Sequence, residues 1–216
     1  MDDPASPILV IGNKNYSSWS MRPWVLMRHF ELPFIERHVM LRRPDTKARL
    51  QAISPAARVP CLITDGEPIW DSLAIMEWLH EAAPGLGMYP AEARTRALAR
   101  SLSAEMHSGF FAIRENLPMN IRRDRSLSAL PAELSEELER IGEIFGAARG
   151  PYLLGRFGIV DAMYSPVVMR LHSYRIPVSA GVRAYMDQVM ATPAVAAWMD
   201  AARREPDALP EIDQLD

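Results

Sequence analysis

The spacing of apolar residues changes at the Pro- and Gly-rich stretch APGLGMYP, residues 83–90. Before this stretch, short apolar runs alternate with segments that have a helical pattern. After Ala91, apolar residues recur at intervals of three and four, as amphipathic helices require, and the sequence shows no convincing strand. Because linkers concentrate Pro and Gly, we expect two domains joined here, an α/β domain at residues 1–84 and an all-helical domain at residues 85–216.

The start of the chain predicts a βαβ unit. ILVIG at residues 8–12 is a short apolar run that ends in glycine, which is typical of a buried strand. A polar loop leads into a helix capped by Ser18 or Ser20, with Pro23 near its first turn, where a missing N–H costs nothing. FIERHVML at residues 34–41 predicts a second strand. Two strands joined through a helix form a parallel pair with a right-handed crossover.

Residues 59–82 predict a hairpin followed by a helix. VPCLI and EPIW are short apolar strands, and the TDG between them is a turn signal. Asp71 or Ser72 then caps a helix that ends near Ala82. The complete order, βαβ followed by ββα, is that of a thioredoxin-like fold.

The second domain has the pattern of five helices. Apolar residues at 98–117 predict one long amphipathic helix, and those at 134–148 predict another. Three more helices are expected at residues 159–172, 179–191 and 194–204.

Composition and charge exclude several classes of partner. The chain has 24 Lys and Arg against 27 Asp and Glu, a net charge of −3, so we expect no binding to nucleic acid or to an anionic membrane. No apolar run approaches the ~18 residues that a membrane-spanning helix needs. The first ten residues, MDDPASPILV, are acidic where a secretory signal is basic, so we expect a cytoplasmic location.

Residues that bind metals are few and scattered along the chain. A single cysteine, Cys61, excludes an internal disulfide and a cysteine-cluster metal site. It has no CxxC partner and stands on an apolar strand, so we expect a buried structural thiol. The five histidines are too far apart in sequence to suggest a local ligand pair, and we expect no metal. These histidines are His29, His38, His80, His107 and His172.

The motifs SSWSMR, RVPCL, DSLAIMEWL and FGIVDAMYSPVV together resemble the cytosolic glutathione transferases, in particular a zeta-like serine class of bacterial type. SSWSMR, residues 17–22, is similar to the zeta-class SSCSWR, with Trp19 in place of its cysteine. RVPCL, residues 58–62, resembles the family's Val-Pro turn, in which the proline is cis. DSLAIMEWL, residues 71–79, resembles the acidic-Ser pair that starts the third helix. FGIVDAMYSPVV, residues 157–168, resembles the helix-6 motif, so the likeness covers nearly the whole chain.

The resemblance implies a function and a mode of assembly. It implies that residues 1–84 bind reduced glutathione as co-substrate and that residues 85–216 contribute the site for a small hydrophobic electrophile. It further implies a detoxifying transferase that is a homodimer and uses no metal. Two alternatives stay open: a glutathione-dependent isomerase of the maleylacetoacetate type, and a non-catalytic glutathione-transferase-like module for binding or assembly. Trp19 in place of the zeta cysteine counts against the isomerase.

The resemblance gives Ser17 the catalytic place, and Ser18 is the second candidate. The thiolate of glutathione is the nucleophile, so the protein must favour the anion over the thiol. A serine hydroxyl at the start of the first helix can donate a hydrogen bond to the sulfur, and the helix dipole acts in the same direction. Serines in such positions are otherwise ordinary loop or cap residues, and this reading stays open.

Five further residues are implied to bind glutathione. Val59 and Pro60 present the backbone to the cysteinyl part of the ligand, like an added strand. Ser72 faces the carboxylate of the γ-glutamyl group and Asp71 attracts its ammonium. Arg58 is one candidate to meet the glycine carboxylate. The other basic candidates are Arg42, Arg43 and Lys47.

The resemblance puts the electrophile site between the domains, against the first loop and the fourth helix. A stripe of Met and aromatic residues at helical spacing is more often part of the core, so both readings stay open. Arg114 is a candidate to attract an anionic co-substrate. The candidates for this site are Met106, His107, Phe110, Phe111, Arg114 and Met119.

The helix-6 motif departs from the family pattern at its cap. Gly158 stands where the family has Ser or Thr, so Asp161 can accept the N–H of residue 158 but no hydroxyl returns the bond. We expect Asp161 to be structural. The pattern also predicts that Gly158→Ser would raise stability by a few tenths of a kcal/mol.

Overall fold

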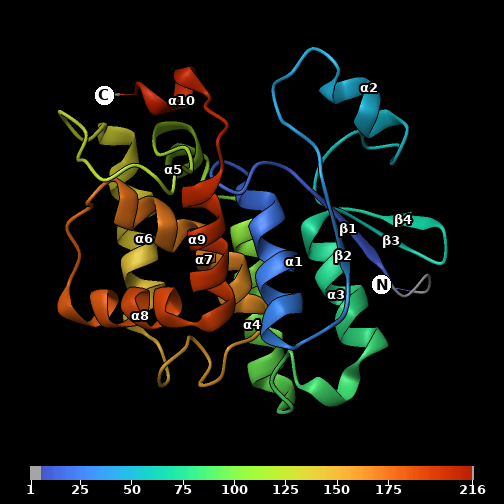
Figure 1. Ribbon diagram of the computed structural model, residues 1–216. Coiled ribbons are helices and arrows are strands. Elements are labelled where there is room, and N and C mark those ends of the chain that lie inside the picture. The colour runs from blue at the N-terminus through green and yellow to red at the C-terminus, as the bar shows by residue number, and fades with distance from the viewer. Residues whose placement is uncertain (1–5, 216) are drawn as a thin grey trace.

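The computed structural model describes residues 6–215, and Figure 1 shows how their elements are arranged. A small sheet with its helices occupies one side of the molecule, and a group of helices occupies the other. The last strand ends at Ile69, and only helices and loops follow it among the described residues. The predicted fold class, a thioredoxin-like α/β part followed by an all-helical part, is confirmed. The acidic start of the chain, residues 1–5, lies outside the described residues.

Four strands form one mixed sheet in the order β2-β1-β3-β4. β1 (Ile8–Ile11) pairs in parallel with β2 (Ile35–His38), and helix α1 (Ser18–His29) makes the crossover between them. β3 (Cys61–Thr64) runs antiparallel to β1 and to β4 (Glu67–Ile69), with which it forms the predicted hairpin. The sheet therefore has the topology that the sequence pattern indicates.

Alternation along the strands gives the sheet two faces that carry buried residues. Leu9 and Ile11 point into the main core, together with residues of α1. Val10 and Cys61 belong to a separate small cluster. Cys61 is fully buried with a free thiol whose pKa is raised by burial, as expected of a structural cysteine. Two helices complete this half, α2 (Thr46–Gln51) and α3 (Ser72–Ala82).

Two local features that the sequence predicts are present, one before β3 and one at the start of α3. The Val59–Pro60 peptide bond, just before β3, is cis. Asp71 is the N-cap residue of α3, and its Oδ1 accepts hydrogen bonds from the N–H groups of Leu73 at 3.0 Å and Ala74 at 3.4 Å. These bonds satisfy donors that the helix itself leaves unpaired.

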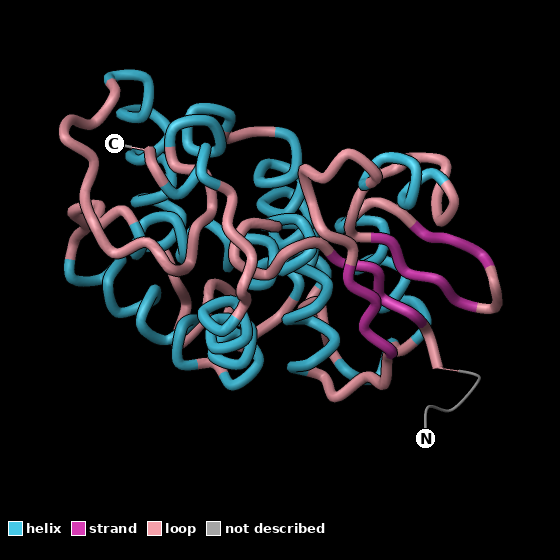
Figure 2. The backbone as a smooth tube through the Cα atoms, turned by 45° about the horizontal axis from the view of Figure 1, so that its top comes forward, coloured by secondary structure: helices cyan, strands magenta, loops and turns pink. Residues whose placement is uncertain are grey.

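Helix α7 (Ile159–Ser173) is the centre of the helical half, and Figure 2 shows the helices gathered on the side away from the strands. All of its residues except His172 are buried, and it packs against α1 and α4. The three helices predicted after residue 158 are confirmed. The other helices are α4 (Ala93–Ser108), α5 (Phe111–Asn116), α6 (Ser135–Gly146), α8 (Ala180–Ala191), α9 (Pro193–Arg204) and α10 (Pro210–Asp213), with short 3-10 helices at Pro84–Leu86 and Ala132–Leu134.

The single helix predicted over residues 98–117 is wrong, because the chain breaks between α4 and α5. Gly109 is extended, and Phe110 is left-handed with a φ of 58°. A Cβ at Gly109 would lie 2.9 Å from the carbonyl oxygen of Glu105. The Glu137 carboxylate accepts hydrogen bonds from two N–H groups in the first turn of α5, at 2.8 and 3.2 Å, and so supports a second helix start.

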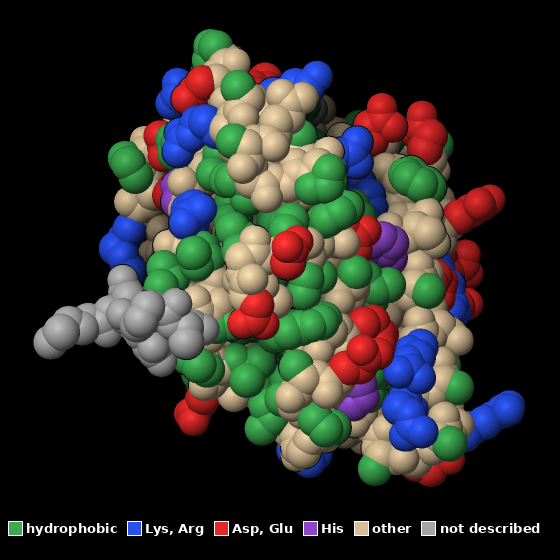
Figure 3. Space-filling model, turned by 90° about the vertical axis from the view of Figure 1, so that its right-hand side faces the viewer, with side chains coloured by type: hydrophobic (Ala, Val, Ile, Leu, Met, Phe, Trp, Pro, Cys, Tyr) green, Lys and Arg blue, Asp and Glu red, His purple; other side chains and the backbone are tan. Residues whose placement is uncertain are grey.

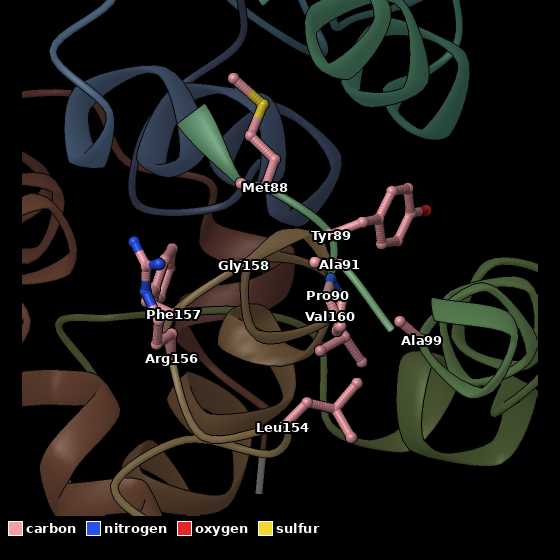
Figure 4. A pocket seen from close by; sticks show the side chains of 11 residues that line it. Met88, Tyr89, Pro90, Ala91, Ala99, Leu154, Arg156, Phe157, Gly158 and Val160 are labelled. Carbon is pink, nitrogen blue, oxygen red and sulfur yellow. The ribbon is translucent and has the colours of Figure 1, made fainter. Parts of the chain in front are cut away.

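Gly158 is a site of close approach, which the sequence pattern does not reveal. Its N–H donates to Asp161 Oδ2 at 3.1 Å, so the expected half of the capping box is present. A Cβ at this position would lie 2.6 Å from the carbonyl oxygen of Met88, on the neighbouring segment in Figure 4. The N–H of Ile159 donates to the same carbonyl at 3.0 Å. The predicted benefit of serine here is therefore wrong.

On the face that Figure 3 shows, acidic side chains lie over the centre and basic side chains lie toward the edges. Basic and acidic side chains are both present, with hydrophobic side chains between them, and no basic side chains gather over the centre of this face. Within residues 6–215, none of the helices combines the length and apolarity needed to span a membrane.

Candidate active site

A cavity of about 520 Å³ lies where the loop before β3, the start of α3, the start of α1 and the end of α4 meet. Five of the seven predicted site residues line it, and they come from the RVPCL and DSLAIMEWL motifs. Trp19 adds a residue of a third motif, SSWSMR. The lining residues are Trp19, Ala56, Arg58, Val59, Pro60, Trp70, Asp71, Ser72 and His107.

Val59 lines this cavity at a bend of the chain just before β3. The ladder between β1 and β3 begins at the pair Val10 and Cys61, so Val59 lies just outside it. The cis bond to Pro60 turns the chain there. A peptide ligand can therefore add to the backbone at Val59 in the manner of an extra strand.

Asp71 carries out two tasks in the structure. While its Oδ1 caps α3, its Oδ2 lies 2.9 Å from Nε2 of His107, at the end of α4. The side chain is 49 % exposed, so the carboxylate remains accessible from the cavity. His107 was a candidate for the electrophile site, but its ring lies beside the residue expected to bind the ammonium of glutathione. Its Nδ1 is buried and has no hydrogen-bond partner.

Neither candidate serine forms part of the cavity wall. Ser17 is the N-cap residue of α1, in place of the predicted Ser18 or Ser20, and is 5 % exposed. Its hydroxyl donates to Oγ of Ser20 at 2.7 Å, and Ser20 Oγ also accepts the N–H of Gly12 at 3.1 Å. The Ser18 hydroxyl accepts a hydrogen bond from Arg170 at 3.1 Å. Between them in sequence, Trp19 does line the cavity.

A buried arginine lies directly behind the cavity wall. Arg22 is fully buried, and its Cζ is 4.1 Å from the centre of the Trp19 ring. Its Nη1 donates to Ser72 Oγ at 3.4 Å, but Nε and Nη2 have no hydrogen-bond partner. Burial lowers the pKa of Arg22 well below its ordinary value, and the neighbouring Arg114 and Arg170 lower it further. A buried cation with unpaired donors favours an anion nearby.

Two more arginines add to the positive charge around Trp19. Arg114 places its Cζ 4.7 Å from the Trp19 ring, and burial lowers its pKa. Arg170 donates to the carbonyl of Leu117 and to Ser18, and burial lowers its pKa to about 9. Among the described residues, neither these two arginines nor Arg22 forms a salt bridge. Arg22 is not among the predicted site residues, although the SSWSMR motif ends on it.

The structure contains a second cavity, of about 170 Å³, where the linker after α3 meets the start of α7 (Figure 4). Met88, Leu154, Phe157 and Val160 give it a mostly apolar lining, and it contains no predicted site residue. Among residues 6–215, no group of His, Cys, Asp and Glu is arranged to hold a metal ion.

Comparisons with known proteins agree with this geometry. The family profile "Glutathione S-transferase, N-terminal domain" matches residues 16–82, and "Glutathione S-transferase, C-terminal domain" matches residues 122–201. Over 103 residues, the chain is 33 % identical to a probable maleylacetoacetate isomerase of Caenorhabditis elegans. That match covers 48 % of this chain and 47 % of the relative, so the chain spans about half of that relative's length.

Two solved structures share the fold over almost the whole chain. A glutathione transferase homolog from Burkholderia gl BGR1, with bound glutathione, is 27 % identical with a TM-score of 0.70, covering 93 % of this chain and 99 % of that chain. A maleyl pyruvate isomerase, described as a bacterial glutathione S-transferase in the zeta class, is 21 % identical with a TM-score of 0.72. It covers 94 % of this chain and 100 % of its own.

Proposed function

Because this chain belongs to the glutathione S-transferase family, we propose that its 520 Å³ cavity binds reduced glutathione and that the enzyme joins the thiol to a small electrophile. The observation that carries the proposal is the convergence of three separate motifs on one cavity. The Burkholderia homolog, which has glutathione bound, supports it. Residues 1–84 then hold glutathione, and residues 85–216 contribute most of the electrophile site.

The chemistry of the lining residues matches the parts of glutathione. The backbone of Val59 pairs with the cysteinyl part, and Arg58 attracts the glycine carboxylate. The hydroxyl and the backbone N–H of Ser72, at the start of α3, face the γ-glutamyl carboxylate. Asp71 attracts the ammonium group, which lies beside His107 because His107 already contacts the same carboxylate at 2.9 Å.

Ser17 activates the thiol with the help of Ser20. Hydroxyl hydrogens rotate, so when Ser20 donates to Ser17, the Ser17 proton becomes free to point at the sulfur. Lowering the pKa of the thiol by about two units needs about 2.7 kcal/mol of preference for the anion. A hydrogen bond to a charged group contributes about 1.5–3 kcal/mol, and the start of α1 adds about 0.3–1 kcal/mol. Ser18 is the alternative donor, because its oxygen accepts from Arg170 while its own proton remains free.

The electrophile carries a carboxylate, which Arg22 and Arg114 attract. Arg22 lies behind Trp19 and Ser72, and a carboxylate reaches its unpaired Nε and Nη2 when the Trp19 ring turns aside. This observation favours glutathione-dependent isomerisation of an unsaturated acid as a second candidate function. The names of two similar proteins, maleylacetoacetate isomerase and maleyl pyruvate isomerase, agree with it.

We further propose a cytoplasmic homodimer. Trp70, at the edge of the cavity, and Phe111 are exposed by 42 % and 68 %, and a partner subunit would cover such side chains. Light scattering on the purified protein measures its mass. A mass near 24.3 kDa at micromolar concentration would contradict the dimer.

Steady-state kinetics with a matched pair of electrophiles tests the proposed reaction. One electrophile carries a free carboxylate, and the other is its methyl ester. The enzyme should prefer the acid, and Arg22→Met should lower kcat/KM for the acid by about 10-fold or more while leaving the ester nearly unchanged. Arg94→Met, at the exposed start of α4, is the control and should change neither value. Equal losses on both electrophiles in Arg22→Met would contradict the carboxylate site, and no glutathione-dependent reaction would favour the non-catalytic module.

A further inference from the structure

The loop that leads to Ser17 is held by the opposite end of the chain. Residues 12–17 connect β1 to α1, and in Figure 1 the red C-terminal segment passes beside this blue loop. The segment Glu205–Asp213 follows α9 and includes α10. It makes hydrogen bonds to Lys14, Asn15 and Tyr16 of this loop, across about 190 positions of sequence.

Glu205 binds the backbone of the loop. Its Oε1 accepts the N–H of Lys14 at 2.6 Å, and its Oε2 accepts the N–H of Asn15 at 3.0 Å. Nε2 of His38, at the end of β2, lies 3.3 Å from the same carboxylate. Burial raises the pKa of Glu205, but the nearby His38 and the hydrogen bonds from the N–H groups of Asn15 and Lys14 outweigh that effect and lower it overall. The charged carboxylate is therefore the form that holds the loop.

The side chain of Tyr16 links the same loop to the C-terminal segment. Its hydroxyl donates to the Asp213 carboxylate, with O–O distances of 2.8 and 2.9 Å. The same oxygen accepts from Arg122 at 2.6 Å and from the N–H of Leu209 at 3.0 Å. Arg122 also donates to the carbonyl of Glu205 at 2.7 Å. With these partners, Tyr16 is not available to the glutathione thiol, although it stands next to Ser17.

Backbone hydrogen bonds within the loop connect Ser17 to the residues that the C-terminal segment holds. The backbone N–H of Ser17 donates to the carbonyl of Asn13 at 2.8 Å, and the N–H of Tyr16 donates to the same carbonyl at 3.1 Å. The loop is thus a closed turn whose outer side is bound by the C-terminal segment and whose last residue is the N-cap of α1. Displacing the turn displaces the Ser17 hydroxyl.

We propose that the C-terminal segment Glu205–Asp213, acting through Tyr16 and Glu205, is a positioning element that aims the Ser17 hydroxyl at the glutathione thiol. The proposal rests on the proposed role of Ser17. Catalytic groups lose much of their effect when they are misplaced by about 1 Å, so a remote contact of this kind affects thiol ionisation without touching the ligand.

A double-mutant cycle between Tyr16→Phe and Ser17→Ala tests this coupling. The measured quantity is the pKa of the thiol of bound glutathione, followed through thiolate ultraviolet absorbance as a function of pH, which needs no electrophile. Ser17→Ala should raise this pKa by about one unit or more. Tyr16→Phe should raise it in the same direction, and the double variant should raise it no further than Ser17→Ala alone. Glutathione affinity, measured by calorimetry, should change much less.

Two further variants complete the test. Asp213→Asn weakens the hydrogen bond between Tyr16 and Asp213 by changing the acceptor, and it replaces Tyr16→Phe in the test if that variant does not fold. Glu211→Gln, in the same helix, breaks only an exposed ion pair with Arg42 and should leave the thiol pKa unchanged. The proposal is overturned if Tyr16→Phe and Asp213→Asn leave the thiol pKa at its wild-type value, or if the effects of Tyr16→Phe and Ser17→Ala simply add. If Ser17→Ala itself has no effect, the assignment of Ser17 under the proposed function fails as well.

Discussion

Gly158 accepts no side chain, because the carbonyl oxygen of Met88 lies 2.6 Å from where a Cβ would stand. Asp161, three residues later, is structural, as the sequence predicts. It is fully buried and accepts hydrogen bonds from the N–H groups of Leu153 and Gly158 and from the hydroxyl of Tyr185. Burial raises its pKa to about 6 despite these donors. The motif identifies the hydrogen bond at Gly158, but the contact with Met88 depends on a segment 70 positions away and is invisible in the sequence.

Substituting Gly158 should therefore destabilise the protein. Gly158→Ser forces a shift of the backbone at Met88 and should lower the free energy of unfolding by about 1–3 kcal/mol. Gly142→Ala is a matched control with the opposite sign, since Gly142 lies within α6 and a Cβ there meets nothing within 4 Å. It should raise stability by up to about 1 kcal/mol. Urea unfolding measures the free energy of unfolding of both variants. A Gly158→Ser protein more stable than wild type would contradict this prediction and would show that the backbone at Met88 moves without cost.

Local signals explain which elements are predictable. The strands, the cis turn at Val59–Pro60 and the cap of α3 at Asp71 each depend on a few adjacent residues, and all are confirmed. The break at Gly109–Phe110 follows an apolar pattern that continues with helical spacing, so periodicity misses it. The Ser18 hydroxyl is bound by the distant Arg170 and the Ser17 hydroxyl by the neighbouring Ser20, and the cavity wall contains Trp19 in their place.

The burial of Arg22 in helix α1 lowers the stability of the protein. Arg22 is buried beside Arg114 and Arg170, and two of its N–H donor atoms are unpaired. An apolar residue at this position would make the folded protein more stable. Arg22→Met should raise the free energy of unfolding by about 1–3 kcal/mol, less the loss of its stacking on Trp19. Thermal and urea unfolding measure this. A destabilised variant would mean that the Trp19 and Ser72 contacts outweigh the burial of the charge.

The whole molecule is tied together by contacts between the two ends of the chain. Glu205 bonds to the β1–α1 loop and approaches His38, while Trp198, in α9, donates to the carbonyl of Lys14 at 3.0 Å. Trp198 also packs against Trp24 of α1, with ring centres 5.2 Å apart. Such long-range contacts give no sequence signal, so local motifs predict five of the cavity's lining residues but not the contacts between the C-terminal segment and the β1–α1 loop.

These contacts predict an acid-sensitive component of stability. The pKa of Glu205 is lower in the folded protein than its ordinary value of 4.5, so its contribution is complete above that pH and is lost as the pH falls through the folded-state pKa. Glu205→Gln should lower the free energy of unfolding by about 2 kcal/mol at pH 7. The difference from wild type should shrink when urea unfolding is repeated at progressively more acidic pH below 4.5. A difference that does not depend on pH would contradict the role of the charge.

Isothermal calorimetry with reduced glutathione is the most direct test of the site. Wild-type protein should bind one glutathione per chain, and Asp71→Asn should weaken binding by about 10-fold, because Asn still caps α3 but no longer offers a charge to the ammonium group. Asp65→Asn, in the turn between β3 and β4 and outside the cavity, is the matched control and should bind like wild type. Absence of binding to the wild-type protein at about 1 mM glutathione would contradict the proposed function, and equal affinity of Asp71→Asn and wild type would contradict the assignment of the cavity.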